Sequence, residues 1–597
     1  MEIHLAQMVR NRAARYGERT VFRVRKPGTK EYRTYSWNEF VRTSDSVARA
    51  LLAAGYSRGA MIGIFSDNKP QWTITDIGVL SVRGVVVPFF STASHEQLKY
   101  IVDETGMELL FAGNQEQLEK ATWLLSNTNS LKKVVCFDPS LSYNEDPRIS
   151  NWDDFLKKGE TDARSAELKA ISDTYEADDL ATVIYTSGTT GEPKGVMLGH
   201  DNFMSCMQIH DERLKVSEQD VSLCFLPLSH IFERAWTFYM LHRGVENVFL
   251  ENPKAVIEEL PLAKPTIMCT VPRFFEKTYD AIRVEESKWP AVKRTIFEWA
   301  IQTGHAVSAF RKKNRPVPPL LRLRHFFAEA MVLKKLRSVF GGRIKTMPCS
   351  GAAIRIDLLK FFHAAGIFVN YGYGASETTA TVSCFKTDQY EFESCGTIMP
   401  GVEVKISDEG EILVKGPTVF KGYYKKPEAT ARVLNAGWYA TGDSGRITAA
   451  GNLVMDERIH DIFKTSGGKF VAPQKVELLL CSDPFIEQAV VIGDNRKFIT
   501  ALIVPSIPAL EAHFQCDLSD TLTRTEYLKK DTVMTFFENR LIEIQQVLTS
   551  YERVVRFTLL NEPFSIENQV LTSTLKIRRK VIASKYHNLV EMMYTQS

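Results

Sequence analysis

Short apolar, β-branched segments alternate with longer segments of helical periodicity through most of the chain. Residues 61–65 and 84–87 are predicted strands, and residues 115–125 are a predicted helix. The run Ala181-Thr-Val-Ile184 reads as a further short buried strand. Alternation of this kind predicts an α/β architecture with largely parallel sheets.

The pattern changes near residue 402. Residues 402–406 and 411–415 alternate apolar and polar positions around an Asp-Glu-Gly turn, which predicts an antiparallel hairpin. Strands are also predicted at 488–492 and 500–504. The predicted helix over 533–548 has one apolar face, formed by Phe536, Phe537, Leu541, Ile544 and Leu548.

A chain of 597 residues is too long for one core, so we expect two domains, residues 1–456 and residues 457–597. Hydrophobic content of 44% and charged content of 24% are those of an ordinary soluble globular protein. The net charge of +3 gives no argument for a nucleic-acid partner.

The nine cysteines include no Cys-x-x-Cys pair, which argues against a structural zinc site or a disulfide framework and fits a reducing compartment. The N-terminus shows no signal peptide, and no segment is long and apolar enough to span a bilayer. We therefore expect a cytoplasmic protein. Peripheral attachment to a membrane surface and homodimer formation are left open by the sequence.

The segment Tyr185-Thr-Ser-Gly-Thr-Thr-Gly-Glu-Pro-Lys-Gly195 follows the predicted strand that ends at Ile184. Hydroxyls, glycine backbone and one cation, Lys194, meet there, which suits a polyphosphate. The segment is not a Walker A loop, because Lys194 is followed by Gly195 and not by Ser or Thr. The order of strand, hydroxyl loop and Pro-Lys-Gly favours phosphate binding over a flexible linker.

This segment resembles the signature of the AMP-forming, adenylate-forming enzymes, which include acyl-CoA synthetases, beetle luciferases and the adenylation domains of peptide synthetases. The resemblance implies a large N-terminal multi-sheet α/β domain, with a β-barrel-like part, and a small mobile α+β C-terminal domain. It also assigns phosphate-loop residues that bind ATP: Thr186, Ser187, Gly188, Thr189, Thr190, Gly191 and Lys194.

The run Asn370-Tyr-Gly-Tyr-Gly-Ala-Ser-Glu-Thr-Thr379 is similar to the family's Tyr-Gly-x-Thr-Glu motif, with Ser376 where Thr is usual. By resemblance Tyr373 and Gly374 lie at adenine, Ser376 approaches the α-phosphate, and Glu377 binds Mg²⁺ together with Thr186. A small-residue turn matches the opposite wall of the adenine site: Gly351, Ala352 and Ala353.

The run Trp438-Tyr-Ala-Thr-Gly-Asp443 resembles the family motif whose aspartate holds the ribose hydroxyls, and Arg458 matches a second ribose contact. The family hinge falls in the same segment, where His460 departs from the usual Lys or Asp. Further on, the resemblance places Lys464, Gly467 and Gly468 on the path of CoA.

Two further motifs concern the binding of the acid and the first reaction step. The run Leu226-Pro-Leu-Ser-His-Ile-Phe-Glu-Arg-Ala235 resembles the acyl site of long-chain acyl-CoA synthetases, so His230 and Trp236 are expected beside the acid. Lys576, in Leu571-Thr-Ser-Thr-Leu-Lys576, matches the lysine that reaches the carboxylate and α-phosphate, although Ser573 replaces a usual proline. Lys576, Glu377 and His230 are thus the expected catalytic residues.

The resemblance implies a long-chain fatty acid–CoA ligase that uses ATP, Mg²⁺ and CoA and forms an acyl-adenylate. Two alternatives stay open: an adenylate-forming ligase for a medium-chain, aromatic or amino acid, and a catalytically silent nucleotide-binding protein. Amino-acid activators carry an aspartate after a Phe near this position, and Glu233 follows Phe232 here; we expect Arg234 to compete for its charge.

Basic residues also interleave with Leu and Phe over residues 311–327. This composition suits an anionic membrane surface. The prolines at 316, 318 and 319 interrupt any continuous amphipathic helix, which favours a solvated basic loop leading into an ordinary helix.

Overall fold

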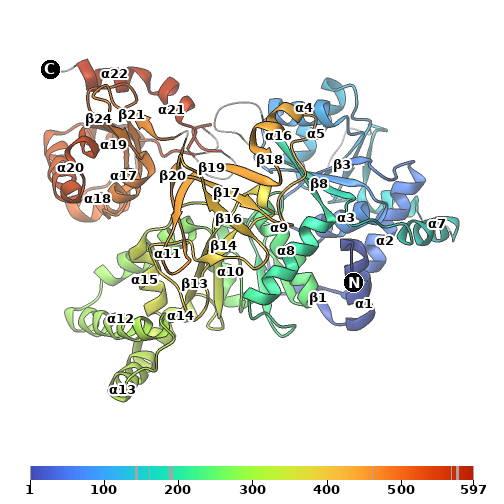
Figure 1. Ribbon diagram of the computed structural model, residues 1–597, viewed down its shortest axis with the longest axis horizontal. Helices are drawn as coiled ribbons and strands as arrows, with labels where there is room; N and C mark the ends of the chain where they lie inside the picture. The colour runs from blue at the N-terminus through green and yellow to red at the C-terminus, as the bar shows by residue number, and fades with distance from the viewer. Residues whose placement is uncertain are drawn as a thin grey trace.

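The computed structural model describes residues 2–141, 146–159, 162–186, 193–459, 461–565, 568–572 and 577–595. Over these residues the strands form six sheets. A large body holds four of them, and a smaller lobe, orange to red in Figure 1, holds the rest near the C-terminus. The predicted α/β class with a large and a small domain is confirmed.

The largest sheet has the order β7-β6-β5-β3-β4-β8-β9, parallel except for the β8–β9 pair. Its strands are β3 (Met61–Phe65), β4 (Val85–Phe89), β5 (Leu109–Ala112), β6 (Lys133–Cys136), β7 (Ile149–Asn151), β8 (Leu180–Thr186) and β9 (Lys194–Gly199). The helices of this region are α2 (Trp37–Ala53), α3 (Pro70–Ser81), α4 (His95–Thr105), α5 (Gln115–Asn127), α6 (Trp152–Lys157) and α7 (Asp162–Ser172).

Local sequence explains where these helices begin. Ser36 accepts a hydrogen bond from the Glu39 backbone N–H and so caps α2. Asn114 and Gln117 form a reciprocal capping box at the start of α5, so the predicted helix begins at residue 115 as expected and extends two residues past 125. The predicted strands of this sheet are confirmed in place, with β3 over residues 61–65.

A second sheet has the order β10-β11-β1-β2. Its elements are α1 (Leu5–Tyr16), β1 (Thr20–Arg25), β2 (Tyr32–Ser36), α8 (His200–Arg213), β10 (Val221–Cys224), α9 (Ile231–Arg243), β11 (Glu246–Phe249), η1 (Pro253–Ala255) and α10 (Val256–Ala263). Ile267 forms parallel bridges to both Ser222 and Thr346, so this sheet continues into the third.

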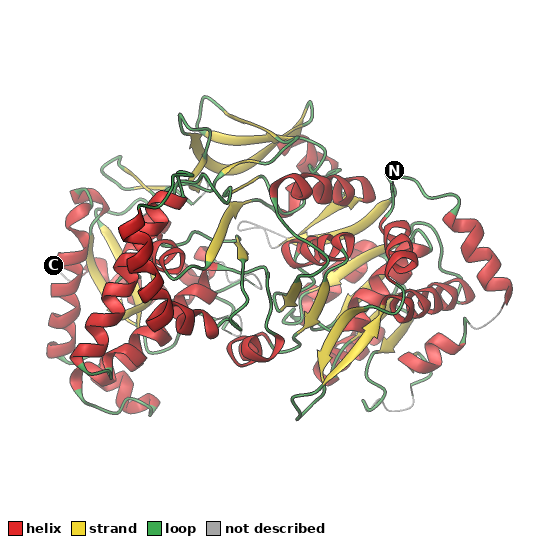
Figure 2. Ribbon diagram, turned by 90° about the horizontal axis from the view of Figure 1, so that it is seen from below, coloured by secondary structure: helices red, strands yellow, loops and turns green. Residues whose placement is uncertain are grey.

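The third sheet has the order β12-β13-β14-β15. Figure 2 shows helices packed around the strands of the molecule. Its elements are α11 (Pro272–Ser287), α12 (Ala291–Arg311), α13 (Pro319–Ala328), the π-helical turn η2 (Glu329–Leu333), α14 (Lys334–Ser338), β12 (Thr346–Cys349), α15 (Ile356–Ala364), β13 (Phe368–Tyr373), η3 (Ser376–Thr378), β14 (Ser383–Cys384) and β15 (Thr397–Ile398).

The fourth sheet is antiparallel and contains the predicted hairpin, in which Glu403 pairs with Lys415. Its elements are β16 (Glu403–Ile406), β17 (Glu411–Lys415), α16 (Pro427–Val433), β18 (Leu434–Asn435), β19 (Trp438–Ile447) and β20 (Leu453–Arg458). It ends at Arg458, where the chain passes to the small lobe.

The small lobe contains the hairpin β21–β22 and the sheet β23-β24-β25. Its elements are β21 (Phe463–Lys464), β22 (Phe470–Val471), α17 (Pro473–Leu480), β23 (Ile486–Ile492), β24 (Ile499–Pro505), α18 (Ile507–Phe514), α19 (Thr521–Tyr527), α20 (Asp531–Ile544), η4 (Gln545–Val547), η5 (Ser550–Glu552), β25 (Val554–Leu559), α21 (Arg579–Lys585) and α22 (His587–Thr595).

Two apolar clusters in this lobe contain only residues from Phe463 onward, so the lobe has a hydrophobic core of its own. The predicted helix over 533–548 contributes Phe537 and Leu541 to that core. Its α-helical part ends at Ile544, and the 3₁₀ turn η4 follows. Polar contacts join the lobe to the large body: Arg273 Nη2 lies 2.6 Å from Glu487 Oε1, and Arg355 Nη1 donates to the Cys481 carbonyl at 2.9 Å. None of the described helices is long and apolar enough to cross a membrane.

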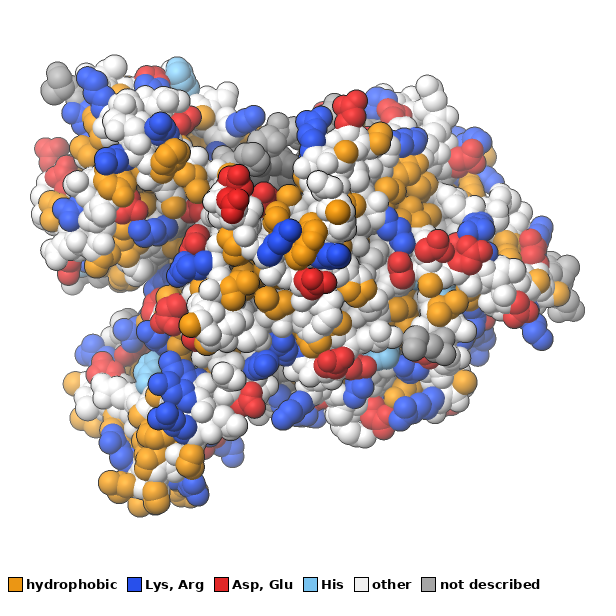
Figure 3. Space-filling view, in the orientation of Figure 1, with side chains coloured by type: hydrophobic (Ala, Val, Ile, Leu, Met, Phe, Trp, Pro, Cys, Tyr) orange, Lys and Arg blue, Asp and Glu red, His pale blue; other side chains and the backbone are white. Residues whose placement is uncertain are grey.

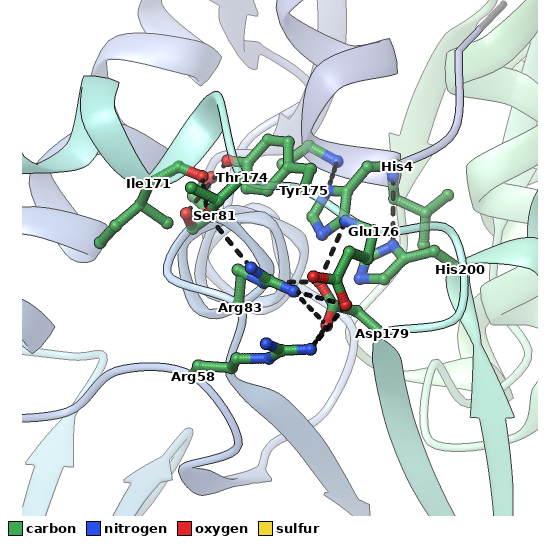
Figure 4. A network of polar contacts seen from close by, with 12 residues as sticks. His4, Arg58, Ser81, Arg83, Ile171, Thr174, Tyr175, Glu176, Asp179 and His200 are labelled. Atoms are coloured by element: carbon green, nitrogen blue, oxygen red, sulfur yellow. Dashed lines mark hydrogen bonds and ion pairs between the residues drawn. The ribbon is translucent and has the colours of Figure 1, made fainter.

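A buried polar cluster fastens the N-terminus to the large body (Figure 4). His4 stacks between Tyr175 and His200, with ring centroids 3.8 and 3.5 Å away. Beside it, Arg83 makes a two-bond ion pair with Asp179 at 2.6 and 2.8 Å. Burial lowers the pKa of His4 to about 3, so this histidine is neutral in the folded protein at physiological pH.

Candidate active site

The predicted phosphate loop spans the connection between neighbouring antiparallel strands β8 and β9, with Thr186 paired to Lys194. Thr186 and Lys194 therefore stand at the two sides of its base. The Lys194 ammonium lies 4.9 Å from the centre of the Tyr423 ring, within cation–π range. The remaining predicted loop residues lie outside the described part of the chain: Ser187, Gly188, Thr189, Thr190 and Gly191.

Glu377 lies in η3, which packs against β9 and so brings the carboxylate to the phosphate-loop side of the sheet. Its Oε1 accepts a hydrogen bond from the Tyr423 hydroxyl at 2.9 Å, and its backbone carbonyl accepts from the Phe420 N–H at 2.8 Å. Tyr423 thus links Glu377 and Lys194. The motif comparison did not select Tyr423; its signal is the Gly-Tyr-Tyr run at 422–424.

The donor set here suits Mg²⁺. Thr186 offers a hydroxyl oxygen and Glu377 a carboxylate, both hard oxygen ligands. No cluster of three or more His, Cys, Asp or Glu able to hold a metal occurs among the described residues. Mg²⁺ needs no such cluster, because it is usually bound by one or two carboxylates together with substrate phosphates.

Tyr373, Asp443 and Arg458 come from three strands and meet at one point. The Tyr373 hydroxyl donates to Asp443 Oδ2 at 2.5 Å, and Arg458 Nε lies 3.3 Å from Asp443 Oδ1. Burial, followed by the nearby Asp443 charge, raises the pKa of Tyr373 well above its usual range. Gly442 has φ +74°, a conformation that favours glycine, and this turn presents the Asp443 carboxylate to Tyr373.

The two predicted adenine walls leave the same edge of the third sheet. β12 pairs in parallel with β13, with Cys349 opposite Tyr371, so the turn at residues 351–353 and the end of β13 are neighbours. The Tyr371 hydroxyl donates to the Ala352 carbonyl at 3.2 Å and holds that turn. A Cβ on Gly374 would lie 1.7 Å from the Ala380 carbonyl, so this position requires glycine.

His230 stands at the N-terminus of α9, where its Nδ1 accepts a hydrogen bond from the Phe232 backbone N–H at 3.2 Å. Its ring lies 6.4 Å from that of Phe90, between centroids. Trp236, further along the same helix, is buried and donates its indole N–H to Ser222 Oγ at 3.0 Å.

The expected pairing of Arg234 with Glu233 is wrong. Arg234 instead makes a two-bond ion pair with Asp76 on α3, at 2.6 and 2.9 Å. Both side chains are 1% exposed, and the Thr182 hydroxyl oxygen is also 2.6 Å from Arg234. Asp76 is the partner because its carboxylate reaches Arg234 from α3, whereas consecutive residues of one helix point in different directions.

Glu233 is fully buried, and its Oε2 accepts from the Leu226 N–H at 3.1 Å. Burial raises the pKa of Glu233 to about 8, so the side chain holds a proton at neutral pH. A neutral carboxyl is a poor partner for a substrate ammonium group.

The predicted CoA residues Lys464, Gly467 and Gly468 lie on the exposed β21–β22 hairpin of the small lobe. The Gly468 N–H donates to the Thr465 carbonyl at 2.8 Å, and Gly468 has φ +79°. Ser376 is half-buried in η3 beside Glu377. Lys576, Ser573 and His460 lie outside the described residues.

Comparison with known proteins identifies the family of the chain. A model described as "AMP-binding enzyme" matches residues 9–424, and one described as "AMP-binding enzyme C-terminal domain" matches residues 460–597. Long-chain-fatty-acid–CoA ligase FadD15 of Mycobacterium bovis is 32% identical over 557 residues, covering 92% of this chain and 90% of that protein. Long-chain-fatty-acid–CoA ligase 5 of Rattus norvegicus is 30% identical, covering 94% and 84%.

Solved structures share the fold. The adenylation domain of a carboxylate reductase from Mycobacterium chelonae superposes with a TM-score of 0.78 at 22% identity, covering 99% of this chain and 91% of that one. O-succinylbenzoate Coenzyme A Synthetase from Bacillus subtilis, in complex with ATP and magnesium ion, gives 0.66 at 19% identity, covering 96% and 98%. Because the family model matches residues 9–424 and a relative is 32% identical over 92% of this chain, the chain belongs to the AMP-binding enzyme family.

Proposed function

We propose that this protein activates a long-chain fatty acid with ATP, through an acyl-adenylate, and transfers the acyl group to CoA with release of AMP and pyrophosphate. The observation that carries the proposal is similarity over nearly the whole chain to curated long-chain-fatty-acid–CoA ligases, at up to 32% identity. Two groups of residues support it: Lys194 and Glu377, joined through Tyr423, suit the phosphates, and Asp443 with Arg458 suits the ribose.

In the first step the fatty-acid carboxylate attacks the α-phosphate, and pyrophosphate leaves. Catalysis of such a step is chiefly positioning and neutralisation of charge on the phosphoryl oxygens. In our proposal Lys194 and the loop after Thr186 hold the departing phosphates, and Lys576 neutralises charge at the reacting phosphorus. Mg²⁺, held by Glu377 and Thr186, would supply further neutralisation of the phosphates.

The nucleoside half is held by hydrogen bonds and stacking. Asp443 and Arg458 would bind the ribose hydroxyls, since an ionised carboxylate accepts from two donors at once. Tyr373 would pack on adenine from one side, and the turn at 351–353 from the other. His230 would lie beside the acid, and Trp236 would contribute to the wall of the acyl site from its buried position.

The second step needs different walls around the same carbonyl, because the CoA thiolate must reach it from the side that Lys576 would occupy in the first step. We therefore propose a boundary between residues 456 and 457 and a rotation of the small lobe about it. Arg458 is the second residue after this boundary, at the end of β20. The rotation would replace Lys576 by the Lys464, Gly467 and Gly468 hairpin, whose glycines admit a thin ligand arm.

The environment of Glu233 argues against the alternative that the protein is a ligase for an amino acid. Glu233 is neutral and turned into the backbone at Leu226, so it offers no charge to an ammonium group. A catalytically silent protein would not need the Glu377 and Asp443 arrangements, both of which are intact.

A long-chain acid resides in lipid, so we extend the proposal to peripheral association with a membrane surface. The cytoplasmic location and the homodimer stay predictions. Size-exclusion chromatography with light scattering tests the dimer.

One experiment tests the proposed reaction: ATP–pyrophosphate exchange and CoA-thioester formation across acids from acetate to long-chain fatty acids. The fastest turnover is expected with long chains. Lys576→Ala is expected to abolish adenylate formation while ATP still binds. Fastest turnover with an aromatic or amino acid would reassign the substrate, and exchange with none of the acids would favour the silent alternative.

A further inference from the structure

Residues 311–337 form a projection at one end of the large body, which we call the α13 projection. It comprises the end of α12, a loop with two prolines, α13, η2 and all of α14 except its last residue. Figure 1 shows α13 at the lower tip of the molecule, away from the strands that carry the candidate active site. The expected basic loop is present at 312–318, but the helix after it exposes large apolar side chains.

The α13 projection exposes large apolar side chains. Leu320 is 74% exposed, Phe326 65% and Leu323 55%. Phe327 and Met331 are about half exposed. Leu320, Leu323, Phe327 and Met331 follow a spacing of three, four and four residues, which places them on one helical face. The Phe326 ring borders this face, with its centroid 5.7 Å from that of Phe327. A face of this kind normally packs on a neighbour, so its exposure indicates contact with something apolar.

An apolar hollow opens on the same face, between α12 and α13. Its volume is about 530 Å³. It is lined by Thr295, Ile296, Trp299, Leu323, Arg324, Phe327 and Met331. The exposed side chains therefore border a recess and not a flat surface.

Charge surrounds this apolar face. Residues 311–337 contain nine Lys and Arg against one acidic residue, Glu329, which gives a local charge of +8 in a chain whose total is +3. Glu329 is itself paired with Arg337. Figure 3 shows orange and blue side chains intermixed over the tip. Exposed cations border the apolar face: Arg311, Lys313, Arg315, Arg322, Arg324, Lys334 and Lys335.

We propose that the α13 projection docks on an anionic lipid surface, with Leu320, Leu323 and Phe326 inserted at headgroup depth and the surrounding cations on lipid phosphates and carboxylates. Amphipathic helices rich in Lys and Arg beside Leu and Phe bind in this way. Each cation near an anionic surface adds attraction. The inference deepens the proposed membrane association and needs no part of the ligase chemistry.

A second copy of this chain fits the face less well. In a two-fold contact the same patch meets itself, so a surface of charge +8 would face another of charge +8. An anionic bilayer satisfies both the apolar side chains and the cations. The charge balance thus selects lipid over self-association.

The test is sedimentation of the full-length protein with phosphatidylcholine vesicles, with and without phosphatidylserine, in the absence of ATP and fatty acid. We expect binding to the phosphatidylserine vesicles and its loss at high salt, because salt screens exposed charges. Arg322→Glu/Arg324→Glu should lower the partition coefficient at least about tenfold. Leu320→Ser/Phe326→Ser should lower it by a similar factor.

Control variants carry comparable changes on exposed residues elsewhere. Arg432→Glu/Lys529→Glu alters net charge equally on exposed residues, and Leu522→Ser removes a side chain that is 78% exposed. Both controls should bind like wild type. An unchanged midpoint of thermal unfolding shows that each variant is folded.

Wild-type protein left in the supernatant with phosphatidylserine vesicles overturns the inference. So does an equal loss in the Arg432/Lys529 control, since net charge alone would then explain binding. If Leu320→Ser/Phe326→Ser splits a dimer and leaves vesicle binding intact, the face joins two copies and the inference is wrong. A protein that binds vesicles but makes no acyl-CoA refutes the ligase proposal alone.

Discussion

Replacing Asp443 by asparagine removes one negative charge from the proposed ribose site and keeps the shape of the side chain. The structure shows what that charge holds. Oδ2 accepts from the Tyr373 hydroxyl at 2.5 Å, Oδ1 lies 3.3 Å from Arg458 Nε, and Asp443 is 5% exposed. Little water reaches the carboxylate, so bulk solvent replaces few of the lost interactions.

The expected cost follows from the number of hydrogen bonds. A hydrogen bond to a charged group contributes about 1.5–3 kcal/mol, and one between neutral groups about 0.5–1.5 kcal/mol. In the proposed complex Asp443 accepts from both ribose hydroxyls. Exchanging a charged acceptor for a neutral one at two bonds therefore costs about 2–3 kcal/mol, or roughly 30- to 160-fold in ATP affinity.

ATP–pyrophosphate exchange at saturating fatty acid measures KM for ATP in this variant. Tyr373→Phe is the matched control, because it removes one hydrogen bond to Asp443 and leaves both the charge and the ring. Its effect on KM should stay below about tenfold. If Asp443→Asn lowers thermal stability but keeps the wild-type KM for ATP, Asp443 is a turn residue and the ribose assignment is wrong.

Three further predictions concern charge and protonation. Glu377→Gln should lower kcat by about 10²- to 10³-fold and raise the Mg²⁺ concentration needed for exchange. Tyr423→Phe should lower kcat by less than about tenfold. Equal effects of the two variants would argue against a metal role for Glu377. Burial holds the pKa of His4 at about 3 in the folded protein, against 6.5 in the unfolded chain, so between these values the unfolded chain binds one more proton. The free energy of unfolding should therefore fall as pH drops from 6.5 to 3, by up to about 5 kcal/mol. Urea unfolding of His4→Gln should show a shallower slope, with the remainder coming from His200 and His363, whose pKa values burial also lowers. An unchanged slope would exclude His4 as a contributor. Burial raises the pKa of Glu457 to about 7 against 4.5 unfolded, so the folded protein binds the extra proton and stability should fall as pH rises from 4.5 to 7, by about 3 kcal/mol. Calorimetry at pH 8 should find Glu457→Gln more stable than wild type, and a less stable variant would contradict this sign.

Local periodicity was enough to locate individual elements. β3 and β17 occupy residues 61–65 and 411–415 as predicted, because alternation or β-branched runs bounded by turn residues define a strand within a few positions. The motifs likewise selected Glu377 and Asp443 as candidate site residues. These features are written in short stretches of sequence.

Partners far apart in the chain were not predictable in the same way. Arg234 was expected to serve its neighbour Glu233 but pairs with Asp76, 158 residues earlier, because the tertiary arrangement of α3 and α9 decides which carboxylate it meets. The same limit hid Tyr423, which reaches Glu377 from 46 residues away. The exposed apolar face of α13 depends on which side of the helix α12 covers, and periodicity alone does not specify that.

The central claim is that the acid becomes reactive by being joined to AMP. Chromatography of the nucleotides and phosphates formed with a long-chain fatty acid, ATP, Mg²⁺ and CoA tests it most directly. We predict one AMP and one pyrophosphate for each acyl-CoA, with acyl-adenylate accumulating when CoA is withheld. Release of ADP and orthophosphate alongside the thioester would contradict the account.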